Sequence, residues 1–162
     1  MSTTLSDTLN RYVIAGCAEA IYCIGDDFGI VCNPQFAILP SHPYRSPLIV
    51  AVYCTAGRAT GRINARTFDI VEGGFLIVLP NQITELIDTT PDFKATYVIM
   101  SEKFTANLGI GNTFDIASIV VERPYIRLEG RAREALDGYI KMCTSLIPIE
   151  EHPHRMEILY LM

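Results

Sequence analysis

Three features of the sequence predict a mainly β domain, a sandwich or barrel, followed by helices. Short apolar segments recur about every 8–12 residues with turn-forming residues between them, which is typical of all-β domains rather than of alternating βα units. After residue 128 the apolar spacing changes to that of an amphipathic helix. The length of 162 residues suits one domain with a full core.

Turn residues in the first half of the chain mark two hairpins. Residues 19–25 and 28–33 lie either side of Gly25-Asp26-Asp27, and residues 58–64 and 66–71 meet at Asn64-Ala65. Further strands are expected at 36–39 (before Pro40), 47–57, 75–80, 83–87, 95–100 and 118–128. The segment 47–57, "PLIVAVYCTAG", is almost continuously apolar, as expected for a strand that is covered on both faces.

Three segments have helical features. Ser101 is a candidate N-cap for a short helix that contains Phe104 and Leu108 and ends at Gly109. The run 129–147 places eight residues on one stripe: Ala132, Ala135, Leu136, Tyr139, Ile140, Cys143, Leu146 and Ile147. Pro148 ends that helix. A second helix is expected to begin at Glu151-His152-Pro153, with Met156, Leu159 and Tyr160 on its apolar side.

Composition and charge limit the classes of function. The chain is 49% hydrophobic and carries a net charge of −5 with no cluster of basic residues, so these residues alone predict a poor DNA-binding surface. No apolar run approaches the roughly 20 residues that cross a bilayer, and the N-terminus lacks the features of a secretory signal. We therefore expect a cytoplasmic protein without a membrane partner.

The cysteines and histidines do not form the pattern of a metal site. Five cysteines are irregularly spaced (Cys17, Cys23, Cys32, Cys54 and Cys143), and we expect small buried hydrophobic residues in a reducing compartment. A barrel metal site usually takes two histidines two residues apart on one strand and a third from a later strand. The three histidines here are His42, His152 and His154, so no metal and no cofactor are expected.

Catalytic motifs are missing as well. The chain has no GxSxG elbow, no Walker loop and no GxGxxG sequence. The carboxylates of Asp26 and Asp27 lie beside Gly25 and suit a turn better than acid–base chemistry. The expectation is a protein that is not an enzyme.

A barrel interior without a catalyst can still bind a small organic ligand, through an apolar lining and a few directed polar groups. Five residues on or next to expected strands are the candidates for such contacts: Tyr44, Tyr53, Arg62, Gln82 and Tyr97. Each has an ordinary alternative, such as a solvated arginine or a core tyrosine with a bonded hydroxyl.

The order of these segments resembles that of a known family. "VYCTAGRATGRINARTFDIVEGGFLIVLPNQITELID", then "DFKATYVIMSEKF", and the later "PYIRLEG…AREALDGYIKM" and "HPHRMEILYLM" resemble the N-terminal regulatory domain of AraC-type bacterial transcription regulators. The resemblance implies a cupin-like double-stranded β-helix, a jelly-roll barrel, followed by a C-terminal helical hairpin. It covers most of the chain from about residue 48 onward, and its order and spacing carry more weight than any one motif.

The resemblance also implies a separate role for each of two parts of the chain. Residues 1–127 would form the sensor barrel and residues 128–162 the dimerisation and linker helices, with a helix-turn-helix DNA-binding domain following Met162 in a longer native protein. We expect a homodimer whose interface uses five residues of the helical stripe: Leu136, Tyr139, Ile140, Cys143 and Ile147. A sugar or another metabolite would be the effector, and DNA would be bound only through the absent domain.

Two alternatives stay open at the level of sequence. One is a free-standing small cupin enzyme, an isomerase or a dioxygenase. The other is a metabolite-binding cupin without a DNA partner.

Overall fold

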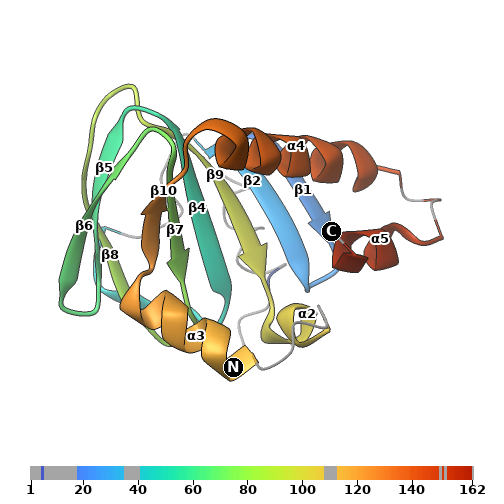
Figure 1. Ribbon diagram of the computed structural model, residues 1–162, viewed down its shortest axis with the longest axis horizontal. Helices are drawn as coiled ribbons and strands as arrows, with labels where there is room; N and C mark the ends of the chain where they lie inside the picture. Colours follow the sequence, from blue (N-terminus) through green and yellow to red (C-terminus); the bar gives the residue numbers. More distant parts are fainter. Residues whose placement is uncertain are drawn as a thin grey trace.

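The computed structural model describes residue 5 and residues 18–34, 41–107, 113–149, 151 and 153–161. Its strands form two antiparallel sheets that face each other (Figure 1). The six-stranded sheet has the order β1 (Ala18–Ile24), β2 (Phe28–Pro34), β9 (Lys94–Met100), β4 (Ile49–Ala56), β7 (Gly74–Val78) and β10 (Tyr125–Arg127). The four-stranded sheet has the order β3 (Tyr44–Arg45), β8 (Ile83–Thr89), β5 (Arg58–Ile63) and β6 (Arg66–Val71).

The inner faces of the two sheets share one apolar cluster. Strand β4 sends Val50, Val52 and Cys54 into it, and the neighbouring strand β9 adds Tyr97. Further members come from the other strands and from the N-terminal segment: Leu5, Val31, Leu48, Ala59, Ile63, Ile70, Leu76, Val78, Ala95 and Ile99. The cluster is the interior of the predicted barrel.

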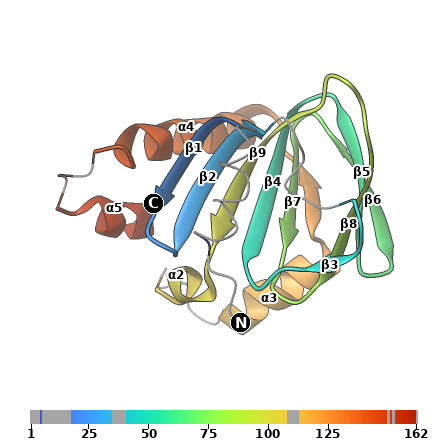
Figure 2. The same cartoon turned by 180° about the vertical axis from the view of Figure 1, so that it is seen from behind.

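Helices cover the outer face of the six-stranded sheet. They are α2 (Glu102–Ala106), α4 (Gly130–Leu146) and α5 (Arg155–Leu161), and α4 and α5 form a hairpin (Figure 1). In Figure 2, seen from behind, the strands lie in front of α4. A second apolar cluster joins the outward side chains of Ile30, Ala51 and Val98 to Cys143 of α4 and to Ile147, which caps the C-terminal end of that helix. Phe104 and Leu159 join the same cluster from α2 and α5.

Most of the local predictions are confirmed. Both hairpins form, with Gly25 and Asn64 at positive φ in their turns. Strand β4 is covered on both faces, and the Ser101 hydroxyl accepts a hydrogen bond from the Phe104 amide as the N-cap of α2. The predicted strand 36–39, the helix end at Gly109 and Cys17 lie outside the described residues. The division at residue 127 stays a prediction.

One predicted strand is wrong in part. Residues 118–128 contain only the short strand β10, because Thr113–Glu122 form helix α3. The β-branched run in this segment favoured a strand, yet tertiary contacts decide otherwise. The Arg66 guanidinium donates to the carbonyls of Val121 and Glu122 and thereby satisfies the C-terminal end of the helix.

The second C-terminal helix also starts later than expected. Its first turn begins at Arg155, and the Ile158 amide donates to the His154 carbonyl. No helix of the described part of the chain is long and apolar enough to cross a membrane.

The Gly-Gly turn between β6 and β7 holds the chain that leads into α4. Gly73 has φ +80°, its amide donates to the Cys54 carbonyl, and its carbonyl accepts from the Leu128 amide. A Cβ atom at Gly73 would lie 2.8 Å from the Leu128 carbonyl oxygen, and one at Gly74 would lie 2.8 Å from the Tyr125 ring. Only glycine allows both the positive φ and this close approach.

We expect Gly73→Ala to lower the free energy of unfolding by about 1–3 kcal/mol, because the side chain is strained at positive φ and contacts the Leu128 carbonyl. Chemical denaturation measures the change. Gly61→Ala is the matched control, since its Cβ would lie 3.6 Å from the nearest atom at an ordinary φ. That variant should be neutral or stabilised by up to about 1 kcal/mol. Equal losses in both variants would contradict the explanation.

Candidate functional site

The structure does not bring the five predicted ligand-binding residues together. Tyr97 faces the barrel interior, whereas Tyr53 is on the opposite face of the sheet, toward α4. Tyr44 is exposed on the short strand β3. Arg62 is exposed and pairs with Glu85 directly across the strand pair β5–β8 at 3.1 Å. The prediction that these residues contact an effector remains untested.

Gln82 takes part in a turn. Its side-chain oxygen accepts a hydrogen bond from the Leu79 backbone amide at 2.8 Å. The backbone amide of Gln82 donates to the Leu79 carbonyl. Asn81 has φ +65°, and its amide donates to the Ser46 carbonyl. The "PNQ" sequence therefore closes a local turn after β7 and ties it to the segment before β4.

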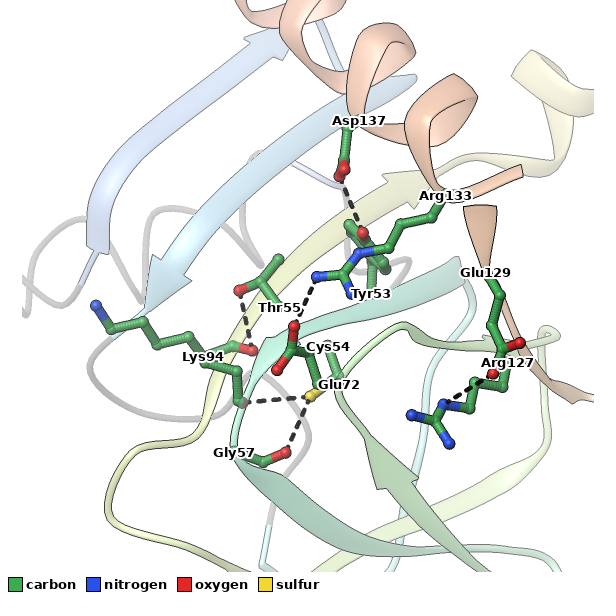
Figure 3. A network of polar contacts seen from close by, with 11 residues as sticks. Tyr53, Cys54, Thr55, Gly57, Glu72, Lys94, Arg127, Glu129, Arg133 and Asp137 are labelled. Carbon is green, nitrogen blue, oxygen red and sulfur yellow. Dashed lines mark hydrogen bonds and ion pairs between the residues drawn. The ribbon is translucent and has the colours of Figure 1, made fainter. Parts of the chain in front are cut away.

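Polar and charged side chains join the barrel wall to α4. The Tyr53 hydroxyl donates to the Asp137 carboxylate at 2.9 Å, across 84 residues of sequence (Figure 3). Tyr53 is only 1% exposed, so its hydroxyl has little access to water. Burial is the main cause that raises the pKa of Tyr53, and the Asp137 carboxylate adds to it. The phenol therefore stays a donor at neutral pH.

Arg133 forms the second half of this contact. Its guanidinium binds Glu72 of the β6–β7 turn at 2.8 Å (Figure 3). It also interacts with the Tyr53 hydroxyl and opposes part of the effect of Asp137 on the Tyr53 pKa. We call Tyr53, Glu72, Arg133 and Asp137 the docking cluster, because it fixes the first half of α4 on the sheet.

The docking cluster suits positioning better than chemistry. One ion pair, Arg133 with Glu72, and one hydrogen bond, from Tyr53 to Asp137, join the four side chains. The phenol keeps its proton and donates it to a hydrogen bond, which is a structural contact and not an activated nucleophile. In the described part of the chain, no three His, Cys, Asp or Glu side chains gather closely enough to hold a metal ion. The arrangement can hold a helix in one register on a barrel.

The residues predicted for the dimer interface divide into two groups. Cys143 and Ile147 are 0% and 4% exposed, and they pack on the chain's own sheet. Leu136, Tyr139 and Ile140 are half-buried, and Tyr139 also packs on this second cluster. The predicted stripe thus contributes to the fold of a single chain. Its part in dimerisation remains a prediction.

Sequence reasoning missed Glu72, Arg133 and Asp137. Arg133 and Asp137 are four residues apart, so they share one side of the helix. That spacing was visible, but an exposed charged pair is the usual explanation for it. Nothing local indicates that the partner is a buried tyrosine on β4.

No protein family and no curated protein matches this chain. Solved structures do match, and they define the class: this is a cupin-fold protein. The AraC-like transcriptional activator CuxR is 18% identical with a TM-score of 0.50, over 83% of this chain and 49% of CuxR. This chain therefore spans about half of the CuxR chain.

Two smaller cupin structures are also similar. The cupin domain of Schizosaccharomyces pombe Cnp3 is 20% identical over 58% of this chain and 68% of that chain, with a TM-score of 0.43. KdgF from Halomonas sp. is 12% identical over 51% of this chain and 76% of that chain, also with a TM-score of 0.43. One fold serves many functions, so these likenesses show the fold alone.

We expect Tyr53→Phe and Asp137→Ala to be non-additive in a double-mutant cycle. Each removes one partner of the same hydrogen bond, so the coupling free energy should be about 1–2 kcal/mol. Urea denaturation of the four proteins measures it. Tyr97→Phe with Asp137→Ala is the matched control, because Tyr97 is equally buried but faces the interior. A coupling below about 0.5 kcal/mol for Tyr53 would contradict the contact.

The buried Cys54 thiol should make stability depend on alkaline pH. Its sulfur contacts the carbonyls of Ala56 and Gly57, and burial raises its pKa from 9.0 to about 11. The unfolded chain loses this proton at lower pH than the folded chain. The contribution to stability is therefore complete below pH 9 and is lost as pH rises toward 11. In Cys54→Ala, the fall of stability over this window should be shallower, by at most about 1.4 kcal/mol per pH unit. Parallel curves for the two proteins would contradict the assignment.

Proposed function

We propose that this chain is the effector-sensing and dimerisation domain of an AraC-type transcription regulator, without catalytic activity. The observation that carries the proposal is the geometry of α4. One side of this helix is fixed to the barrel wall, and another side presents a narrow seam to solvent. A barrel that fixes the position of this helix suits a regulator in which two subunits must pair in one defined arrangement.

The exposed seam follows the spacing of a helix–helix contact. Ala135, Gly138, Met142 and Ser145 are all exposed and are separated by three, four and three residues. This 3–4 spacing places them in one line along the helix. The Met142 side chain is 45% exposed, and a Cβ atom at Gly138 would meet no atom within 4 Å. Gly138 is an unfavourable residue in the middle of a helix, and no contact within the described chain requires it.

Two copies of this seam complement each other in an antiparallel arrangement. Met142 of one copy then lies over Gly138 of the other, and Ala135 lies opposite Ser145. Glu134 and Lys141 are on the same edge of the seam, so that the carboxylate of one copy lies on the side of the other copy's ammonium group. The four seam residues span about 15 Å along the helix. Such a short contact predicts a dimer that depends on concentration.

The resemblance to AraC-type regulators supplies the remaining roles. In this proposal a DNA-binding unit follows α5, and pairing of two chains brings two such units together so that each half-site binding aids the other. A small metabolite inside the barrel would act by binding one arrangement of barrel and helices better than another.

We expect the wild-type chain to form a dimer and Met142→Glu to weaken it at least about tenfold, because the substitution buries a charge without a partner. Sedimentation velocity over a range of concentrations measures the dissociation constant. Ile119→Glu is the matched control: Ile119 is 62% exposed on α3, away from the seam. It should leave the dissociation constant unchanged.

Other outcomes are equally informative. A wild-type chain that stays monomeric at high concentration would contradict the dimerisation role and favour a free-standing cupin. If Ile119→Glu disrupted the dimer and Met142→Glu did not, the chain would still be a dimer, but the seam on α4 would not be its interface.

A further inference from the structure

Strand β4 carries residues of both apolar clusters in alternation. Val52 and Cys54 point into the barrel interior, and Tyr53 between them points to α4. The strand lies inside the six-stranded sheet, hydrogen-bonded to β9 on one side and to β7 on the other. Any shift of this strand that changes the packing around Val52 therefore moves the Tyr53 hydroxyl as well.

The two halves of α4 are attached to the barrel in different ways. From Tyr139 onward the helix buries apolar side chains, with Cys143 at 0% exposure. From Gly130 to Gly138 every residue is exposed except Arg133 and Leu136, which are half-buried. The first half therefore depends on the docking cluster for its place on the sheet.

The start of α4 has little stabilisation of its own. The N-cap residue Glu129 makes no side-chain capping bond, and no acidic residue is present in the first turn. Gly130, the first residue of the helix, has φ +53°. A helix start without a cap and with few buried contacts is the kind of segment that opens locally while the rest of a domain stays folded.

We propose that Tyr53 is a positioning residue that couples the packing of the barrel interior to the docking of the first half of α4. A hydrogen bond of 2.9 Å weakens steeply with displacement and misalignment, so a small movement of β4 weakens the Tyr53–Asp137 bond. The segment 130–138 then leaves the sheet, while the second half of α4 stays attached through Cys143 and Ile147.

The biological use of this device rests on the proposed function. Ala135 and Gly138, half of the seam, lie on the segment that is released. An interior ligand that moves β4 would therefore change the surface that a second copy meets. The coupling itself is a property of one chain and can be measured without dimerisation or DNA.

Hydrogen–deuterium exchange of the whole chain, analysed by peptides that cover 131–138 and 139–146, tests the coupling. Tyr53→Phe should lower the protection of 131–138 about fivefold, the loss expected for one hydrogen bond, and leave 139–146 unchanged. Tyr97→Phe, with an equally buried tyrosine that faces the interior, should leave both segments unchanged apart from any global loss of stability.

The decisive variants change the interior without touching the docking cluster. Val52→Ala on β4 should lower the protection of 131–138 about fivefold beyond its effect on global stability, and it should have no further local effect when Tyr53→Phe is present. Val31→Ala on β2 is the matched control, because it removes the same atoms from the same cluster on a strand that has no docking-cluster residue. Cys54→Ala is a milder second variant if Val52→Ala does not fold.

Equal local effects of Val52→Ala and Val31→Ala would overturn the proposal, and so would an α4 whose protection does not change in Tyr53→Phe. All measurements are made in the Met142→Glu background at low concentration. Failure of the coupling is thereby distinguished from failure of the dimer: the first appears in exchange of the single chain, and the second appears only in sedimentation of the wild type.

Discussion

The placement of the first half of α4 on the barrel depends on the contact between one buried phenol and one carboxylate. The Tyr53 hydroxyl has little access to bulk water, and a buried donor without a partner is costly. Asp137 satisfies it from a helix 84 residues further along the chain. Together with the packing of Cys143 and Ile147, this contact sets how α4 lies on the sheet. Glu72 and Arg133 then hold the same helix against the turn beside it, so the helix and the barrel wall position each other.

The two sheets differ in what covers them. The six-stranded sheet has apolar side chains on both faces, one set in the barrel interior and the other under α2, α4 and α5. The outer face of the four-stranded sheet carries cross-strand polar pairs instead, such as Arg58 with Asp69 and Arg62 with Glu85. The six-stranded sheet can be apolar on both sides because helices cover its outer face.

A structural feature could be predicted from the sequence where neighbouring residues alone determine it. The hairpins at Gly25 and Asn64 were predictable because a turn is decided by its own residues. The direction of Tyr53 was not, because a strand covered on both faces has no polar alternation to show which residues point inward. Helix α3 was missed because contacts such as the one from Arg66 overrule the preference of its β-branched residues.

The C-terminal helices illustrate the same limit. Periodicity predicted a helix over 129–147, and the helix is present at Gly130–Leu146. Periodicity did not say what its apolar side would contact, since the same stripe suits a barrel wall and a second subunit equally well. The side chains of Cys143 and Ile147 pack on the barrel, and the side of α4 that carries Met142 stays exposed.

Helix α5 has a consequence for whatever is joined to the chain after it. Leu159 is buried in the second apolar cluster, and the Tyr160 ring lies 4.9 Å from that of Phe104. Helix α5 is therefore packed against the rest of the domain through these side chains. A fluorescent protein or any other module attached directly behind α5 would start from a fixed direction in space, and its orientation would report on the barrel.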